Sequence, residues 1–422
     1  MFDLIVLGAG PGGYEAALYA AELGKSVALV EERQLGGTCL NRGCIPTKAY
    51  LHAAACATDR TAMLAHKEAA VSALRKGVEA QLKKAKVTLL EGRGTLVAQG
   101  IVEISGERFE AEHVLLAVGS APAIAPIEGA ATALTSDDLL SGELPVFHRL
   151  TIIGGGVIGV EFATIYANLG TQVTILEYEP RILPQIDKEI AQSVAMALKK
   201  QGIGIITGAA VTEIAPDKTV TYVAKDQAAT LPADGVLLAT GRRANTANLS
   251  VPNLRMERGF IPTNDRFETC VPKVYAIGDC RLGAIQLAHN ATAEGCNAVA
   301  HMCAAPLPYD LRLIPACVYT SPEVATVGAA VGEPGTYSGK ALTAASGKGM
   351  AVAAERGYIR LIFEQETDKL LGAQAICDRA TDMIGLLAVL IRGGVTRQAI
   401  TRTVFPHPTF GECIHTAAAE AK

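Results

Sequence analysis

Residues 6–31 read "VLGAGPGGYEAALYAAELGKSVALVE", and this stretch decides the fold because the chain repeats it. Residues 152–177 read "IIGGGVIGVEFATIYANLGTQVTILE", in the same register and without a gap. Each copy runs from an apolar strand through Gly-x-Gly-x-x-Gly into a helical pattern, a glycine stop, a second apolar strand and a terminal acid. Strand, glycine turn and helix in this order are typical of a Rossmann-like dinucleotide-binding unit. The sequence therefore predicts two of them.

The glycines of each copy have distinct physical tasks. The first permits the tight turn, the second lets the backbone approach a pyrophosphate, and the third allows close packing of helix on strand. The helix start then offers unpaired N–H groups and a partial positive charge to the phosphates. A single such motif could be a structural glycine turn, but the full layout occurs twice here. The expected nucleotide-binding glycines are Gly8, Gly10 and Gly13 in the first copy and Gly154, Gly156 and Gly159 in the second.

An acid ends the second strand of each copy, Glu31 in the first and Glu177 in the second. A carboxylate at this position accepts hydrogen bonds from a ribose diol and repels a 2′-phosphate. Each site is therefore expected to take FAD or NAD rather than NADP.

Composition limits the remaining classes. The chain has 422 residues, half of them apolar, and a formal net charge of -4. This length predicts two to four domains, and the charge gives no basic surface for nucleic acid. No apolar run reaches the roughly 20 residues of a membrane span, and the first residues lack the features of a signal peptide. Ten cysteines scattered through a large chain favour a reducing compartment, so we expect a cytoplasmic protein.

Later segments extend the pattern. Apolar strands end in glycine turns at 113–122 and 235–244, and a third strand at 273–280 ends with Asp279, which could face a ligand or simply cap a turn. From about residue 309 the sequence pattern changes: it predicts strands around a turn at Glu366–Asp368, followed by a helix that breaks at Gly393–Gly394. This part predicts a third domain without a nucleotide motif.

Two cysteines stand close together in "GGTCLNRGC", residues 36–44. Cys39 and Cys44 could be unrelated buried thiols, zinc ligands or a redox disulfide. A zinc site needs four ligands, and the neighbouring sequence supplies no others. A helix expected after Pro46 would favour thiolate at its start. The closeness of Glu31 predicts that the pair lies beside a flavin.

With these residues in view, the chain resembles the flavoprotein disulfide reductases, and most closely their dihydrolipoamide branch. The resemblance spans nearly the whole chain in the order of the family. It rests on "GAGPGGY" (8–14), "LVEERQLGGTCLNRGCIPTKA" (29–49), "IIGGGVIGVEFA" (152–163), "ATGRRANT" (239–246), "VYAIGD" (274–279), "LAHNATAEG" (287–295), "LIPACVYTSPEVATVG" (313–328) and "FPHPTFGE" (405–412).

The resemblance implies an α/β fold with two Rossmann-like domains, one for FAD and one for NAD, and a C-terminal α+β dimerisation domain. The boundaries expected from it are 1–120 and 246–311 for the FAD-binding domain, 121–245 for the NAD-binding domain and 312–422 for the dimerisation domain.

The resemblance also implies catalytic roles. Cys44 would form the thiolate next to the flavin, and Cys39 would exchange disulfide with the substrate. His407 would be the acid–base partner of Cys39, reaching in from the second subunit of a homodimer, with Glu412 holding its imidazole. Lys48 would lie near the flavin and pair with Glu161, which would also lie near the nicotinamide.

Further binding residues follow from the same resemblance. The expected FAD contacts, besides the first glycine motif and Glu31, are Gly37, Thr38, Lys48, Gly119, Asp279 and Ala288. The expected NAD contacts, besides the second glycine motif and Glu177, are Glu161 and Gly241.

Simpler explanations stand beside four of these roles. Thr409-x-x-Glu412 fits a helix capping box, so Glu412 could serve a helix start alone. His407 could be an ordinary loop histidine, and Lys48 a lysine that covers apolar surface with its stem. Glu161 has a counterpart at Glu15, so it could be an acid favoured in a helix's first turns.

The choice of substrate rests on few residues. Val157 stands where glutathione reductases typically carry a tyrosine, and Glu177 fits NAD. The implied reaction oxidises protein-bound dihydrolipoyl groups with NAD⁺, and the partner would be a separate lipoyl-bearing protein of a 2-oxoacid dehydrogenase or glycine-cleavage complex. A small-thiol or coenzyme A disulfide reductase, a thiol-independent NADH oxidase or diaphorase, and a non-enzymatic assembly component remain alternatives. The chain is shorter than typical members around 56–66, around 329–340 and after Glu412.

Overall fold

The computed structural model describes residues 1–56, 58–247, 249 and 253–422. The chain divides into two compact units. Unit 1 comprises residues 1–125, 134–145 and 240–311, and unit 2 comprises residues 126–133, 146–239 and 312–422. Three segments of unit 1 thus fall within the range 121–245 predicted for the NAD-binding domain: residues 121–125, 134–145 and 240–245. The predicted domain boundaries themselves stay predictions.

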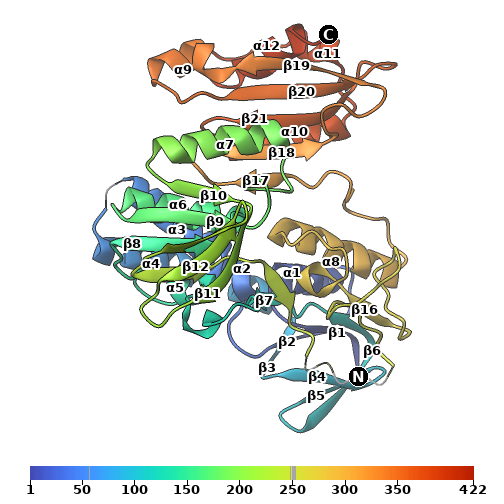
Figure 1. The fold of residues 1–422 in the computed structure, drawn as a ribbon. Coiled ribbons are helices and arrows are strands. Elements are labelled where there is room, and N and C mark those ends of the chain that lie inside the picture. The colour runs from blue at the N-terminus through green and yellow to red at the C-terminus, as the bar shows by residue number, and fades with distance from the viewer. Residues whose placement is uncertain (57, 248, 250–252) are drawn as a thin grey trace. The chain divides into compact units, whose positions relative to one another are not determined.

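Unit 1 is built on a mixed sheet whose parallel part has the order β3-β2-β1-β6-β16 (Figure 1). Strands of a parallel sheet are covered on both faces, which explains the unbroken apolar runs in β1 and β2. An antiparallel extension, β5 and β4, continues from β6. The strands are β1 (Phe2–Leu7), β2 (Val27–Glu31), β3 (Thr88–Glu91), β4 (Gly94–Ala98), β5 (Ile101–Ile104), β6 (Glu107–Leu116) and β16 (Val274–Ala276).

Helices cover this sheet, and α1 packs against α8 beside β1 (Figure 1). The segment around α5 is fixed to α3 and α4, because the Tyr50 hydroxyl donates to the Gly142 carbonyl at 2.6 Å and Lys67 Nζ donates to the Leu140 carbonyl at 3.2 Å. The helices of unit 1 are α1 (Pro11–Glu22), α2 (Gly37–Arg42), α3 (Cys44–Ala55), α4 (Arg60–Lys84), α5 (Ser136–Leu140) and α8 (Ala288–Met302), with a 3₁₀ turn η2 (Gly278–Cys280). Two further strands, β7 (Ser120–Pro122) and β15 (Arg242–Ala244), pair antiparallel.

Unit 2 contains a second parallel sheet of order β10-β9-β8-β14. Its strands are β8 (Arg149–Ile153), β9 (Gln172–Glu177), β10 (Gly204–Thr207) and β14 (Gly235–Leu238), and its helices are α6 (Val157–Asn168) and α7 (Lys188–Lys200). An antiparallel ribbon of β11 (Ala209–Ile214), β12 (Val220–Ala224) and β13 (Gln227–Leu231) adjoins it, with a short 3₁₀ turn η1 (Ala130–Thr132).

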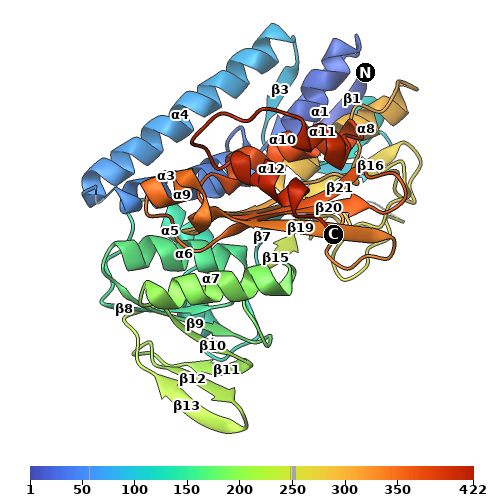
Figure 2. The ribbon, with the colours of Figure 1, turned by 90° about the horizontal axis from the view of Figure 1, so that it is seen from above.

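The C-terminal part of unit 2 is an antiparallel sheet of order β17-β18-β21-β20-β19. Figure 2 shows α10, α11 and α12 over one face of this sheet, where they enclose an apolar core. The strands are β17 (Ala316–Val318), β18 (Val324–Gly328), β19 (Thr336–Leu342), β20 (Tyr358–Glu364) and β21 (Leu370–Ile376). The helices are α9 (Gly347–Ala351), α10 (Ala380–Arg392), α11 (Arg397–Thr401) and α12 (Glu412–Ala419), with a 3₁₀ turn η3 (Thr343–Ala345).

Charged contacts attach α7 to this C-terminal sheet. Glu189, in the first turn of α7, contacts Lys340 of β19 and Arg360 of β20. At the other end of α7, Lys200 Nζ lies 2.6 Å from a carboxylate oxygen of Glu355. These contacts link the second Rossmann-like sheet to the C-terminal sheet within unit 2.

The predicted fold class is confirmed: both repeats form strand, glycine loop, helix and strand, and an α+β part follows. The expected turn at Glu366–Asp368 joins β20 to β21, and α10 ends at Gly393. One element differs. Helix α3 begins at Cys44, before Pro46 and not after it. Proline is tolerated in a first helical turn because the N–H that it lacks has no intrahelical partner there. Among the described residues, no helix combines the length and apolar character needed to cross a membrane.

Candidate active site

The first glycine motif forms a tight loop between β1 and α1. Gly8 adopts a left-handed conformation (φ +101°), and its N–H donates to the Val30 carbonyl at 2.9 Å. A Cβ at Gly13 would lie 1.9 Å from the Gly8 carbonyl oxygen, so the helix can approach the strand end only with glycine there. No described side chain caps α1 at Gly10, and its first turn carries no acid. The helix start therefore offers the positive end of its dipole to an anion, although Pro11 has no N–H and the Gly13 N–H donates to the Gly10 carbonyl at 2.9 Å.

The second motif reproduces this loop between β8 and α6. Gly154 has φ +110°, and a Cβ at Gly159 would lie 2.0 Å from the Gly154 carbonyl oxygen. Helix α6 starts after Gly156, again without a cap from any described side chain and without an acid in its first turn. The two predicted nucleotide sites thus have the same backbone construction, and both fit a bound pyrophosphate.

The acid at the end of each second strand clamps its own glycine loop. Glu31 accepts the Ala9 N–H at 2.8 Å through Oε2 and the Arg33 N–H at 2.9 Å through Oε1. Glu177 accepts the Gly155 N–H at 2.5 Å and the Glu179 N–H at 2.7 Å in the same way. A carboxylate has about four lone-pair positions, so each acid keeps acceptor capacity for ribose hydroxyls. Both acids therefore fit a plain ribose.

The chain leaving β2 returns directly onto the first glycine loop. The Gly36 N–H donates to the Ala9 carbonyl at 2.8 Å. Gly37 has φ +57°, and a Cβ there would lie 2.6 Å from the Gly10 Cα. Only glycine permits this contact of backbone with backbone. Helix α2, which starts at Gly37 and carries Cys39, is therefore held against the phosphate loop.

The structure brings Cys39 and Cys44 together. Both thiols are half-buried, and they interact by a hydrogen bond. The neighbouring Cys44 and burial raise the pKa of the Cys39 thiol, while the positive charge of Lys48 opposes this rise. Cys44 is the first residue of α3, where the helix dipole stabilises negative charge. The pair can therefore close as a disulfide or open with Cys44 placed to carry a thiolate.

His407 and Glu412 form a pair in unit 2. His407 Nδ1 lies 2.9 Å from Glu412 Oε1, and Glu412 Oε2 accepts the Thr409 N–H at 2.9 Å. One carboxylate oxygen of Glu412 thus contacts the imidazole, and the other holds the Thr409 backbone. The expected capping box does not form, because α12 begins at Glu412 itself, after Gly411, and no described side chain caps it. The Thr409 N–H and then His407 lower the pKa of the Glu412 carboxyl. The His407 side chain is 72% exposed. With Nδ1 engaged, Nε2 is the nitrogen that can exchange a proton with a substrate.

Lys48 and Glu161 lie in different units. Lys48 is half-buried in α3. Glu161 is 3% exposed in α6, and its Oε1 accepts the Tyr319 N–H at 3.1 Å. A buried carboxylate tied to a segment beyond β17 is more than an acid favoured in a helix's first turns. The predicted pairing of Lys48 with Glu161, and that of His407 with Cys39 of a second subunit, stay predictions.

Asp279 lies in η2, just past the carboxyl end of β16. The Ser120 hydroxyl donates to Asp279 Oδ2 at 2.5 Å. Ala288 begins α8, which no described side chain caps and whose first turn has no acid. Asp279 and this helix start together fit a nucleotide that offers hydroxyls and phosphate.

The remaining predicted contacts are backbone positions and one threonine. Gly119 (φ +66°) precedes β7, and Gly241 (φ +107°) precedes β15. Thr38 is half-buried in α2. Gly241 belongs to unit 1, whereas its predicted ligand is NAD; its role, like those of the other predicted site residues, stays a prediction.

Sequence reasoning gave no role to the residues that hold the Asp279 turn. Glu294, 1% exposed, accepts the Gly278 N–H at 2.8 Å, Arg281 Nη2 at 2.5 Å and Asn290 Nδ2 at 3.0 Å. The signal was present in "LAHNATAEG", where an acid stands among alanines and glycine on a buried helix. Such an acid needs buried partners.

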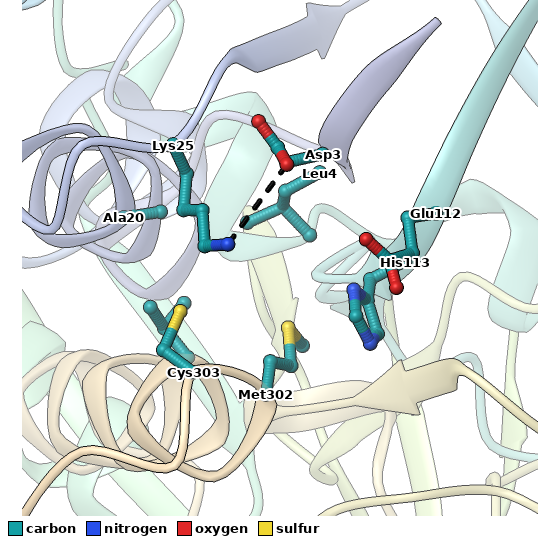
Figure 3. Close-up of a pocket in the computed structure, with 9 residues that line it drawn as sticks. Asp3, Leu4, Ala20, Lys25, Glu112, His113, Met302 and Cys303 are labelled. Carbon is teal, nitrogen blue, oxygen red and sulfur yellow. Dashed lines mark ion pairs between the residues drawn. The ribbon is translucent and has the colours of Figure 1, made fainter.

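A small cavity of about 90 Å³ lies elsewhere in unit 1 (Figure 3). Its lining includes Asp3, Lys25, Glu112, His113, Met302 and Cys303, and Lys25 Nζ lies 3.9 Å from Asp3 Oδ1. Burial lowers the pKa of His113 there. Residues at the starts of β1 and of the parallel part of β6 form the cavity, so it lies at the edge opposite the glycine loop. Nucleotides bind at the carboxyl ends of parallel strands, and this cavity is far smaller than a cofactor site.

Comparisons with known proteins agree with this geometry. Residues 2–295 match the pyridine nucleotide-disulphide oxidoreductase family, and residues 314–418 match its dimerisation domain. A dihydrolipoyl dehydrogenase of Chlamydia pneumoniae is 37% identical, covering 97% of this chain and 95% of that protein. One of Bacillus subtilis (strain 168) is 36% identical, covering 100% and 98%.

Solved structures give the same result. An HOCl-induced flavoprotein disulfide reductase of Escherichia coli superposes with a TM-score of 0.89 at 26% identity, covering 99% of each chain. The two glycine loops fit the FAD and NAD(H) that the family uses, and the resemblance expected from the sequence is confirmed. The chain belongs to the pyridine nucleotide-disulphide oxidoreductase family.

Proposed function

We propose that this protein oxidises dihydrolipoyl groups to lipoyl groups and reduces NAD⁺ to NADH. The observation that carries the proposal is the contact between the Cys39 and Cys44 thiols on a helix pair seated against the first glycine loop. The dihydrolipoyl dehydrogenases named above, similar over nearly the full length, support this substrate class over other disulfides.

The chain offers separate binding residues for the two nucleotides. FAD would be held by the first glycine loop, Glu31, Gly37, Thr38, Lys48, Gly119, Asp279 and Ala288, and NAD by the second loop, Glu161, Glu177 and Gly241. When bound, FAD accepts two electrons from a thiolate and delivers them to NAD⁺ as hydride.

The protein's own residues carry out the sulfur chemistry. His407 Nε2 takes a proton from one thiol of the substrate, and the resulting thiolate attacks Cys39 Sγ of the Cys39–Cys44 disulfide. The bond between the two cysteines breaks, and Cys44 leaves as a thiolate at the start of α3. The second substrate thiol, deprotonated in turn, attacks the substrate sulfur of the mixed disulfide, and Cys39 departs. The substrate is then a disulfide, and its two electrons reside on the cysteine pair.

Assembly completes this proposal. The dimerisation domain supports a homodimer in which His407 of one subunit serves Cys39 of the other. The dithiol would arrive on a lipoyl-bearing protein of a 2-oxoacid dehydrogenase or glycine-cleavage complex. A cytoplasmic location remains a prediction from the scattered cysteines.

Steady-state assays test the proposal. We expect the purified protein to turn over dihydrolipoamide with NAD⁺ much faster than with NADP⁺, and faster than small thiols or coenzyme A as electron donors. Cys39→Ser should lose this turnover while retaining FAD. Turnover that survives Cys39→Ser would contradict the proposal and support a thiol-independent oxidase or diaphorase. Preference for another thiol would keep the chemistry and reject the substrate.

A further inference from the structure

Two strands of unit 1 meet beside Asp279. β7 follows Gly119, β15 follows Gly241, and they pair with Ser120 opposite Ala244. Asp279 comes from η2, far away in the sequence. Ser120 is 3% exposed, so its polar atoms need partners within the protein.

Three side chains form a directed hydrogen-bond chain here. Arg242 Nε donates to Ser120 Oγ at 2.7 Å, and Arg242 Nη2 donates to the Ser120 carbonyl at 2.8 Å. The Ser120 hydroxyl has one proton, and it donates this proton to Asp279 Oδ2 at 2.5 Å. Because Arg242 can only donate and Asp279, when ionised, can only accept, the direction of the chain is fixed.

Arg242 and Asp279 also form an ion pair. Arg242 Nε lies 3.6 Å from Asp279 Oδ2, and the two side chains are 13% and 22% exposed. A carboxylate next to an anionic pyrophosphate is unfavourable by itself, and a guanidinium that stays charged at every relevant pH offsets it. Among the described residues, the hydrogen bonds of Asp279 run through Oδ2, which leaves Oδ1 for a hydroxyl of a ligand.

We propose that Arg242 and Ser120 are positioning residues for the flavin. They orient the Asp279 carboxylate to accept a hydroxyl of FAD, and they neutralise its charge where the phosphates bind. This inference rests on the proposed FAD contact at Asp279. Arg242 and Ser120 would thus contribute to FAD affinity through Asp279, without having to touch the cofactor themselves.

The test measures the FAD dissociation constant of deflavinated full-length protein by flavin fluorescence. Hydrogen bonds to charged groups are worth enough that Arg242→Gln should weaken FAD binding about 10- to 100-fold, and Ser120→Ala about 5- to 20-fold. Ser120→Thr, which keeps the hydroxyl, should restore most of the affinity. Arg243→Gln is the matched control, because Arg243 is the next residue of β15 and is exposed; it should stay within about twofold of wild type.

A double-mutant cycle separates this role from a merely structural one. In an Asp279→Asn background, Arg242→Gln should cost much less FAD affinity than it does in wild type, because its effect passes through the carboxylate. Equal losses in both backgrounds would overturn the proposal. So would a variant whose apoprotein melts at lower temperature while its FAD affinity is unchanged.

The same data keep this inference apart from the proposed function. If wild type binds FAD but does not oxidise dihydrolipoamide, the proposed function fails and the cycle still decides the role of Arg242. If Asp279→Asn binds FAD as tightly as wild type, the inference fails even when turnover of dihydrolipoamide is normal.

Discussion

The two glycine loops are built alike, but the chain that returns over each of them differs. Over the first loop, Gly36 and Gly37 lay backbone on backbone and lead straight into the helix that carries Cys39. Over the second, the Leu183 N–H donates to the Gly155 carbonyl at 2.8 Å, and the chain continues to α7, which Asp187 caps. The two loops therefore have the same construction, and they differ in the returning segment, which carries Cys39 only at the first loop.

The means of holding each returning segment also differ. Leu183 has a positive φ (+49°) but is buried, so packing of its side chain supports the strained backbone. Gly37 has no side chain, and the close backbone contact holds it instead. Both returning segments donate an N–H to their loop at 2.8 Å, but only the first adds the close backbone contact of Gly37 with Gly10.

The largest expected effects come from the third glycine of each loop. Gly13→Ala and Gly159→Ala each place a Cβ about 2 Å from a carbonyl oxygen, which forces helix and strand apart. Gly13→Ala should abolish FAD retention, and Gly159→Ala should weaken NAD⁺ binding at least about 100-fold while FAD stays bound. Bound flavin per chain and NADH titration measure the two effects.

Gly170→Ala is the control for the second loop. Gly170, just after α6, has φ +83°, unlike Gly159, and a Cβ there meets open space. Its substitution should cost only backbone strain of about 1–2 kcal/mol and leave NAD⁺ affinity intact. If Gly159→Ala instead released FAD and spared NAD⁺, the assignment of the two loops would be reversed.

Gly37→Ala tests how α2, the helix that carries Cys39, is held against the first glycine loop. The new Cβ would lie 2.6 Å from the Gly10 Cα, so α2 must move. A displacement of about 1 Å can cost roughly 100-fold in rate, and we expect that loss in dithiol turnover. NADH oxidation by an artificial dye, normalised to bound flavin, should fall much less. Equal loss of both activities per bound flavin would show that Gly37 does not act by positioning the thiols.

Substitution of Glu31 or Glu177 should have a smaller effect, and each should weaken the binding of one cofactor only. Glu177→Gln removes the charge that receives the Gly155 N–H and a ribose diol, and should raise the NAD⁺ dissociation constant about tenfold. Glu31→Gln should do the same for FAD. Each variant should leave the other cofactor's affinity within about twofold of wild type. Crossed effects in isothermal titrations of both variants would argue against independent sites.

The smallest expected effect is on the stability of the protein at acidic pH. The Thr409 N–H and His407 lower the pKa of Glu412, so its folded-state pKa lies below the unfolded one. The stability that Glu412 contributes is therefore present above the unfolded pKa, and it is lost as pH falls through the lowered folded pKa. Carboxyl NMR should place its midpoint below the usual value of about 4.3. In Glu412→Gln, the melting temperature should depend less on acid; an unchanged dependence would remove the pair as its source.

Local patterns predicted the parts of the molecule that are encoded locally. The glycine loops and the end of α10 before Gly393 depend on residues near one another in the sequence, and the structure has them as expected. Glu31 and Glu177 end their strands as predicted, but their contacts with the glycine loops were not predicted, and their contact with a ribose stays a prediction. The predicted start of α3 after Pro46 is wrong, because a first helical turn tolerates proline and α3 begins at Cys44.

Partners far apart in sequence could not be predicted. Ser120 meets Asp279 and Arg242 only after two strands pair, and Glu294 finds Arg281 only when α8 folds against η2. Glu189 of α7 meets Arg360 of β20 for the same reason. No periodicity or spacing encodes such contacts, since each depends on how whole elements pack.

Thiol counting tests the central claim most directly. The oxidised protein and the protein reduced anaerobically with NADH are alkylated under denaturing conditions, and the labelled peptides are identified by mass spectrometry. We predict that Cys39 and Cys44 become labelled only after reduction, while the other cysteines are labelled equally in both samples. If NADH reduces the flavin but the labelling of Cys39 and Cys44 does not change, the cysteine pair is not the electron acceptor and the account is wrong.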